Sequence, residues 1–150
     1  EYSSLIEAPV ETVFAFHEKP EAFETLAPPR RRIEILRRQG GIEEGGELEF
    51  RMRVGFFWVR WRARHTCYER NRVFADEQVR GPFRFWRHEH RFEPEGGGTR
   101  LSDSIRFSLP GGAPADWLLG WLVRLQLRRY FRFRHEVTRR IAARMQRLQA

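Results

Sequence analysis

The sequence predicts an α+β fold in which a curved antiparallel sheet of about seven strands packs around one long C-terminal helix, with two short N-terminal helices. Two observations lead to this prediction. Residues Ala115 to Gln149 contain no Gly after Gly120 and are rich in Leu, Arg, Gln and Ala, which favours one helix. Most of the preceding chain alternates apolar and polar residues between turns that contain Gly or Pro, which is typical of antiparallel strands.

The expected C-terminal helix has one apolar side. Its apolar residues recur at steps of three and four, and they are Val123, Leu127, Tyr130, Val137, Ile141 and Leu148. A helix of this length would run roughly 50 Å, which is too long for one short helix to cover. A broad sheet that curls around the helix would cover its apolar side.

Composition indicates a folded chain that forms one domain over residues 1–150. Hydrophobic residues make up 41% of the chain, which excludes a disordered protein. The 13 Phe and 5 Trp exceed the needs of a small core, so some should line a cavity or the surface. No stretch reaches the roughly 18 apolar residues of a membrane span, so no stable membrane insertion is expected. The single cysteine, Cys67, permits no internal disulfide and fits a cytoplasmic location.

The net charge of +8 comes almost entirely from arginine, since Lys19 is the only lysine. A positive charge attracts anions, although high arginine usage also follows from genomic composition. Arginines interleave with Trp58 on the expected outer face of the sheet, a pattern that would suit nucleic acid. Glu47 and Glu49 neutralise part of this face, so a solvated, salt-bridged surface is the preferred interpretation and no nucleic-acid partner is expected.

The N-terminal part predicts a strand, two short helices and a second strand. Pro9 suits the first turn of a helix, and Pro28-Pro29 ends one. The expected ranges are Tyr2 to Glu7, Val10 to His17, Pro20 to Leu26 and Arg32 to Arg38.

The sequence predicts a hairpin of two strands, Glu47 to Val54 and Phe57 to His65, joined by Gly55-Phe56. A two-residue turn sets the apolar residues of both strands on one face. The expected pairs on that face are Val54–Phe57, Met52–Val59 and Phe50–Trp61. The expected pairs on the other face are Arg53–Trp58, Arg51–Arg60, Glu49–Arg62 and Glu47–Arg64. Three of these outer pairs are favourable, as a cation over a ring or as opposite charges, and Arg51–Arg60 is not.

Three further strands complete the expected sheet. Their ranges are Arg72 to Arg80, Arg84 to Phe92 and Thr99 to Leu109, with a Glu93 to Gly98 turn before the last one. The segment from Pro110 to Pro114, which contains Gly111-Gly112, then links the sheet to the helix.

Histidines and acidic residues fall on the expected inner face of these strands. Pairing Phe92 with Leu101 sets His90 directly opposite Asp103, with His88 on the same face. The Asp103 carboxylate should favour the imidazolium and so raise the pKa of His90, whereas burial alone would lower it.

The turn Gly81-Pro82-Phe83 leaves the register of the preceding strand open. A turn of three residues brings Asp76 opposite His88, and the residues that then face inward are Phe74, Asp76 and Gln78. With a turn of two residues, the inward residues are instead Val73, Ala75, Glu77 and Val79.

The polar inner face, together with His65, has several interpretations. It could be a hydrogen-bond network that satisfies itself, or a patch that orients a ligand. His90 oriented by Asp103 could act as a general base, although no nucleophile signature lies beside it. His88 and His90 with an acidic residue across the strand could bind zinc, but no cysteine or third well-placed histidine completes the set, so no metal is expected. Gly96-Gly97-Gly98 precedes a strand rather than a helix, so no phosphate-binding loop and no cofactor are expected.

The order of elements and three local sequences resemble the START and Bet v 1-like (SRPBCC) superfamily, in particular its polyketide cyclase/dehydrase-type bacterial ligand-binding domains. The local sequences are Ile6-Glu7-Ala8-Pro9-Val10-Glu11-Thr12-Val13-Phe14, Gly81-Pro82-Phe83 followed by Trp86-x-His88-x-His90-x-Phe92, and Thr99-Arg100-Leu101-Ser102-Asp103. The resemblance covers nearly the whole chain and implies a helix-grip fold around a hydrophobic cavity. Members bind lipids, sterols, polyketides or other apolar molecules, and some are cyclases, but no common catalytic set carries over residue by residue.

We therefore expect a monomer or weak homodimer that binds or carries a hydrophobic small molecule, such as a lipid, polyketide or isoprenoid-like compound. The expected ligand-binding residues are Phe50, Met52, Trp61, His65, Phe74, Gln78, Trp86, His88, His90, Asp103, Phe107, Trp121 and Leu125. The alternative is a cyclase, dehydratase or isomerase acting on a bound ketone or polyketide, with His90 and Asp103 as the proton-transfer pair and His88 and Asp76 as further candidates.

Overall fold

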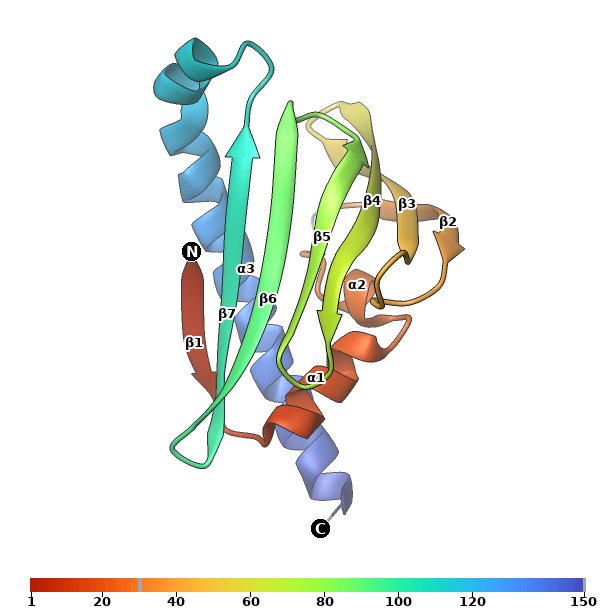
Figure 1. The fold of residues 1–150 in the computed structure, drawn as a ribbon, viewed down its shortest axis with the longest axis vertical. Helices are drawn as coiled ribbons and strands as arrows, with labels where there is room; N and C mark the ends of the chain where they lie inside the picture. The colour runs from red at the N-terminus through yellow and green to blue at the C-terminus, as the bar shows by residue number, and fades with distance from the viewer. Residues whose placement is uncertain (30, 150) are drawn as a thin grey trace.

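The computed structural model describes residues 1–29 and 31–149 and shows the expected α+β fold (Figure 1). The first elements are β1 (Tyr2–Ile6), α1 (Val10–Glu18), α2 (Ala22–Thr25) and β2 (Ile33–Gln39). The rest of the sheet and the last helix are β3 (Glu47–Val54), β4 (Phe57–Glu69), β5 (Val73–Arg80), β6 (Phe85–Glu95), β7 (Gly98–Ser108) and α3 (Ala113–Gln149). The predicted fold class is confirmed, and most boundaries differ from expectation by one or two residues.

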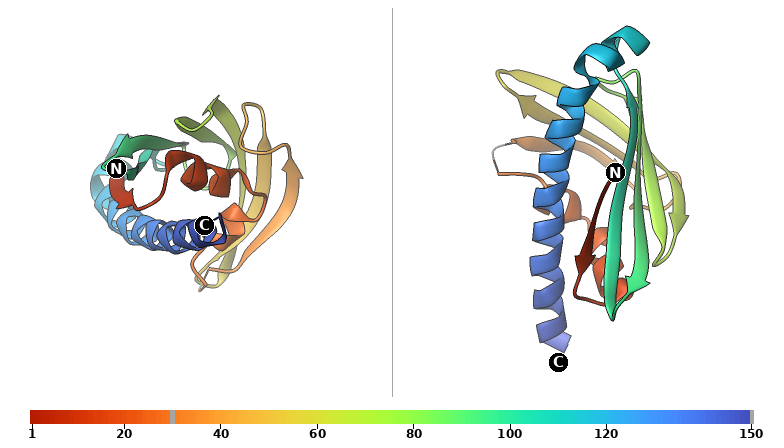
Figure 2. Two further views of the ribbon diagram at one scale, coloured as in Figure 1. Left: turned by 90° about the horizontal axis from the view of Figure 1, so that it is seen from below. Right: turned by 90° about the vertical axis from the view of Figure 1, so that its left-hand side faces the viewer.

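The seven strands form one antiparallel sheet in the order β1-β7-β6-β5-β4-β3-β2. The sheet curves around α3, and α1 and α2 close one end of the space between them (Figure 2). Because α1 lies between the sheet and α3, its Phe14 is fully buried and contacts the rings of Phe74 and Phe92. This end of the molecule is a solid core, and the opposite end stays open.

The long helix begins at Ala113, two residues before the predicted start. Pro114 is compatible with the first turn, where no intrahelical N–H bond is lost. The Asp116 carboxylate fixes this end to β7, since it accepts hydrogen bonds from the Leu109 N–H and the Ser108 hydroxyl at 2.6 and 2.9 Å.

The predicted apolar side of α3 divides into three parts. Leu127 packs near the aromatic residues of the sheet, while Val137 and Ile141 pack against α1 and α2. Leu148 is 80% exposed, so its place in a buried stripe is wrong, because the helix extends past the sheet there. The most buried line of the helix consists of Phe131, Arg134, His135, Thr138 and Ala142.

The β3–β4 hairpin has the predicted register, including Val54 opposite Phe57 and Phe50 opposite Trp61. The four predicted outer pairs also stand opposite each other, but two of the favourable side-chain contacts expected of them form with other residues. Arg51, not Arg53, lies over the Trp58 ring, with its guanidinium 4.6 Å from the ring centroid. The ion pairs of Glu49 with Arg60 and of Glu47 with Arg62 are diagonal, which the twist of the strands favours. The predicted Glu47–Arg64 pair is present as well.

The register of β5, β6 and β7 resolves the alternatives that the sequence left open. Asp76 pairs with His88, as a three-residue turn would give, and His90 pairs with Asp103. The predicted Glu93 to Gly98 turn is wrong, because β6 runs to Glu95 and β7 starts at Gly98. The short turn needs left-handed backbone, which Gly96 and Gly97 supply with φ of +57° and +81°.

Candidate functional site

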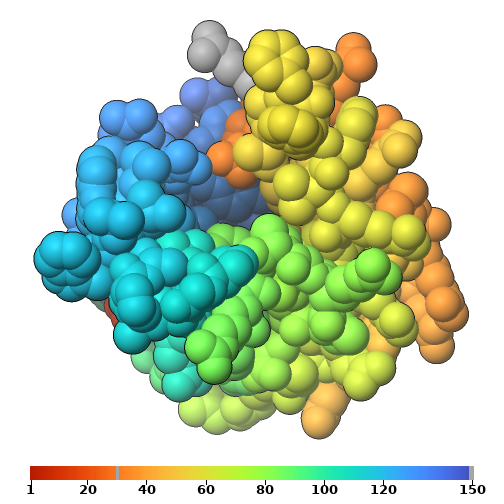
Figure 3. Space-filling view, turned by 90° about the horizontal axis from the view of Figure 1, so that it is seen from above, coloured from red at the N-terminus to blue at the C-terminus, as the bar shows by residue number. Residues whose placement is uncertain are grey.

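A cavity of about 440 Å³ lies between the concave face of the sheet and α3. Viewed from its open end, the molecular surface is hollowed between α3, the β3–β4 hairpin and the strands β5 and β6 (Figure 3). The lining is mainly aromatic and aliphatic and includes Phe23, Leu48, Phe50, Met52, Trp61, Phe74, Phe83, Trp86, Leu127 and Phe131. Such a lining suits a hydrophobic ligand.

Ring-to-ring packing builds the wall of this cavity. Phe50 and Trp61, a cross-strand pair, stack with centroids 6.0 Å apart, and Trp86 meets Trp61 edge-on at 5.1 Å. Phe23 from α2 lies 4.7 Å from Phe50 and Phe83 lies 4.8 Å from Trp86. The strand residues among them alternate with residues that face outward, so the strand period of two places them on the inside.

A buried carboxylate, Asp103 on β7, lies at the centre of the polar part of the site. Its Oδ1 accepts a hydrogen bond from His88 Nε2 at 2.7 Å, and its Oδ2 accepts one from His135 Nε2 at 2.5 Å. His90 Nδ1 is 2.6 Å from Oδ1 but does not form a hydrogen bond with it, so this buried nitrogen has no hydrogen-bond partner among the described residues. Asp103 and His135 are 3% and 0% exposed, so water does not compete for these bonds.

The Asp103 carboxyl stays ionised. Burial alone would raise its pKa, but the neighbouring His90 and the hydrogen bonds from His135 and His88 outweigh this effect and hold the pKa well below 3.8. The carboxylate therefore contributes stability at neutral pH that is lost only in strong acid.

The prediction of a raised pKa for His90 is wrong. Burial is the largest influence and places the pKa of His90 well below 6.5, and the nearby His88 lowers it further. Asp103 favours the charged form but already holds His88 and His135 through hydrogen bonds. Because burial outweighs the attraction of Asp103, His90 is neutral at neutral pH.

Two buried histidines of the site were missed in the sequence. His135 on α3 makes a second hydrogen bond through Nδ1, which is 2.7 Å from the Ser4 hydroxyl of β1. His17 on α1 donates from Nδ1 to the Val13 carbonyl at 2.8 Å and lies 5.9 Å from the His90 ring. The spacing of Phe131, His135 and Thr138 by four and three residues could have indicated that His135 lies on one side of the helix with them.

His17 has a strongly lowered pKa. Burial lowers the pKa of this imidazole from 6.5 to about 4, the bond to Val13 opposes the shift, and the charge of Arg134 adds to it. His17 is therefore neutral at physiological pH, and its protonation would oppose folding.

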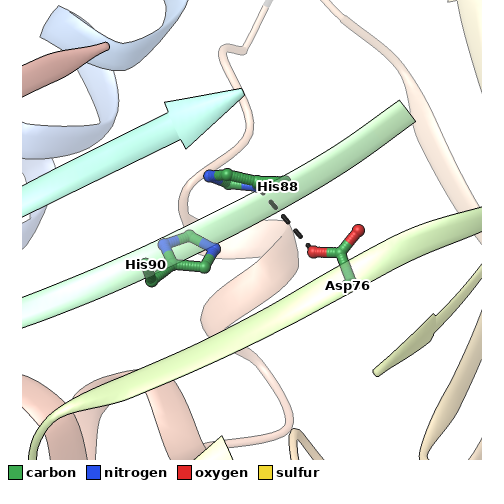
Figure 4. Close-up of side chains that lie close together, drawn as sticks. All are labelled: Asp76, His88 and His90. Atoms are coloured by element: carbon green, nitrogen blue, oxygen red, sulfur yellow. Dashed lines mark ion pairs between the residues drawn. The ribbon is translucent and has the colours of Figure 1, made fainter. Parts of the chain in front are cut away.

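Asp76, His88 and His90 are the described residues that could hold a metal ion (Figure 4). One potential ligand atom from each lies within 4.8 Å of the other two, and His88 Nδ1 is 3.8 Å from Asp76 Oδ1. The group consists of the two histidines and an acidic residue across the strand, which is the set that the sequence already offered. Asp103 accepts a hydrogen bond from Nε2 of His88, the ring nitrogen that does not face Asp76, as the carboxylates that orient metal-bound imidazoles commonly do.

Eight of the thirteen residues expected to bind ligand line the cavity, and they are Phe50, Met52, Trp61, His65, Phe74, Trp86, His88 and His90. The other five do not line it. Trp121 and Leu125 are 59% and 42% exposed in the first third of α3, where Trp117 is 84% exposed too. Gln78 bonds to the backbone of Phe83, while Asp103 and Phe107 line a separate groove of about 340 Å³ beside α3.

The structure contains no helix that is long and apolar enough to cross a membrane, within its described residues.

Comparison with known proteins agrees with this architecture. The model of the family described as "Polyketide cyclase / dehydrase and lipid transport" matches residues 6–142. No curated protein matches the chain in sequence.

Solved structures share the fold at low sequence identity. TTHA0849 from Thermus thermophilus has a TM-score of 0.74 and 18% identity, and 96% of each chain is covered. The Zhui aromatase/cyclase from Streptomyces sp. R1128 has a TM-score of 0.72 and 17% identity, covering 95% of this chain and 92% of the other. Ara h 8.0201 has a TM-score of 0.64 and 12% identity, covering 91% and 94%.

Replacing His17 with Asn should make stability less dependent on pH. In the wild type, stability is lost as pH falls from about 6.5 towards 4, because the unfolded chain binds a proton that folded His17 does not. An asparagine amide at this position can still donate to the Val13 carbonyl. Urea unfolding at pH 7 and pH 5 should show a loss that is smaller in His17→Asn by roughly 2 kcal/mol. Equal losses would contradict the account of His17.

Replacing Asp103 with Asn should destabilise the protein by about 3 kcal/mol at pH 7, because histidine N–H groups would face an amide in place of a buried charge. The control is Glu95→Gln, which removes an exposed ion pair with Arg100 and should change stability little. Urea unfolding measures both. Similar small effects of the two substitutions would show that Asp103 does not hold the cluster together.

Proposed function

Because the chain belongs to the polyketide cyclase/dehydrase and lipid transport family, we propose that it binds and carries a hydrophobic small molecule between the sheet and α3. The observation that carries this proposal is the open cavity of about 440 Å³ with its aromatic wall. A protein whose interior were packed for stability alone would fill this space. Burial of a ligand against Phe50, Trp61 and Trp86 would supply most of the binding free energy.

The polar cluster supports carriage more than catalysis. A general base works best when its pKa lies near the operating pH, and the pKa of His90 lies well below 6.5. Asp103 does not line the cavity, so it acts on a ligand only through the histidines. In this proposal His88 and His90 orient the ligand by hydrogen bonds.

Narrowing the cavity should weaken binding of an apolar probe. N-phenyl-1-naphthylamine fluoresces in apolar surroundings and should bind the wild type. Met52→Trp adds bulk to a residue that lines the cavity and should raise the Kd about tenfold or more. Val79→Trp is the matched control, since Val79 is half-exposed and lies outside the lining, and it should leave the Kd within twofold.

Fluorescence titration at constant protein concentration decides between the outcomes. Equal Kd values for the two tryptophan variants would place the probe outside the cavity. No fluorescence gain with the wild type would contradict binding of a hydrophobic molecule.

A second candidate function is proton transfer on a bound ketone, as in a cyclase, dehydratase or isomerase. The observation that favours it is that His88 and His90 both line the cavity and both lie within 2.7 Å of the Asp103 carboxylate. A carboxylate that orients an imidazole beside an enclosed substrate is a common arrangement for general acid–base catalysis.

Deuterium exchange tests this candidate directly. If the site moves protons, the wild type should exchange the α-hydrogens of 2-tetralone in D2O faster than buffer, as followed by NMR. His90→Gln should remove the acceleration while the affinity for N-phenyl-1-naphthylamine stays within twofold. Exchange at the buffer rate with the wild type would count against proton transfer and leave the carrier function standing.

A further inference from the structure

Arg134 on α3 is a buried cation that lines the cavity without an acidic partner among the described residues. It is 9% exposed. Its Nη1 donates to the Tyr130 hydroxyl at 3.3 Å, and its guanidinium lies 5.5 and 5.8 Å from the ring centroids of Tyr130 and Phe131. These contacts use one of its five N–H groups and two ring faces.

A buried charge without a counter-ion is unfavourable, and ring faces recover only part of the lost hydration. The charge of Arg134 also acts on its neighbours, because after burial it is one of the causes that lower the pKa values of His17 and His90. Among the described residues, no acidic side chain therefore neutralises the charge of Arg134 inside the cavity.

Other charged residues of the lining are mostly paired within the protein. Arg38 pairs with Glu24, Glu47 pairs with Arg62 and Arg64, and Glu18 accepts a hydrogen bond from Tyr68. A hydrogen bond from a neutral hydroxyl leaves the charge of Glu18 in place, so the lining residues that remain are the cations Lys19, Arg31 and Arg134 and the anions Glu18 and Asp76. Asp76 already faces His88 at 3.8 Å. The balance of charge in the cavity is thus positive.

We propose that the ligand of this cavity is an apolar molecule with one carboxylate group, which pairs with Arg134. The inference rests on the proposed carrier function and names the ligand class. A guanidinium presents a planar fork that matches a carboxylate, and the pair is strongest where water is excluded. The Tyr130 hydroxyl lies beside Arg134 and can donate to the same group. The apolar remainder of the ligand would lie along Phe50, Trp61 and Trp86.

The test compares two competitors of equal chain length that differ in their head group. Dodecanoate and dodecan-1-ol are each titrated against bound N-phenyl-1-naphthylamine at pH 8. With the wild type, dodecanoate should displace the probe at an about tenfold lower concentration than dodecan-1-ol. In Arg134→Gln the two competitors should act within twofold of each other, each measured against the probe Kd of that variant. Arg132→Gln, at an exposed position on the same helix, should keep the wild-type difference.

Each result has a separate meaning. If the probe binds but both competitors act equally on the wild type, the carboxylate proposal is overturned and the carrier function stands. If the probe does not bind at all, both are overturned. A preference for dodecanoate that survives in Arg134→Gln would also overturn the role of Arg134.

Thermal unfolding distinguishes an arginine that binds ligand from an arginine that stabilises the fold. Without ligand, Arg134→Gln and Arg134→Met should be at least as stable as the wild type, because each removes an unpaired buried charge. Dodecanoate should raise the Tm of the wild type more than that of either variant. Loss of the fold in both variants would overturn the proposal, because it would mean that the protein itself holds the charge of Arg134.

Discussion

The buried carboxylate of Asp103 is the constraint on which the arrangement of the site depends. An ionised group at 3% exposure must receive hydrogen bonds from the protein, and it receives them from His88 of β6 and His135 of α3. His135 in turn contacts Ser4 of β1. One charge therefore connects three strands with the long helix. This connection fixes how α3 is rotated relative to the sheet, and so it decides which helix residues face the cavity.

The same rotation explains how a packed core and an open cavity coexist along one helix. Beyond the Asp103 cluster, α1 fills the space between sheet and helix, and Val137, Ile141 and Ala142 pack there. On the other side of the cluster the space between the sheet and α3 stays open, and Leu127 and Arg134 of α3 border the cavity there. A ligand bound there would meet aromatic rings on the sheet side and a cation on the helix side.

Local patterns in the sequence predicted the sheet well. The Gly55-Phe56 turn and the strict alternation around it allow only one register for β3 and β4, and the same reasoning placed His90 opposite Asp103. The helix was harder, because a period of 3.6 does not fix which side of a long helix meets which partner. His135 and Arg134 were therefore missed, and Leu148, expected on the covered side of the helix, and Trp121, expected to bind ligand, are both exposed. The pKa of His90 was misjudged because the pair with Asp103 was expected to outweigh burial, whereas burial is the larger influence and the neighbouring His88 lowers the pKa further.

The central claim, that a hydrophobic molecule occupies this cavity, can be tested at the two methionines of the chain. Met52 lines the cavity, whereas Met145 packs against α1 and α2 at the closed end. We predict that N-phenyl-1-naphthylamine, added to protein with 13C-labelled methionine methyl groups, shifts the Met52 signal in the NMR spectrum and leaves the Met145 signal in place. A shift at Met145 alone, or at neither methyl group when the probe is bound, would contradict the claim.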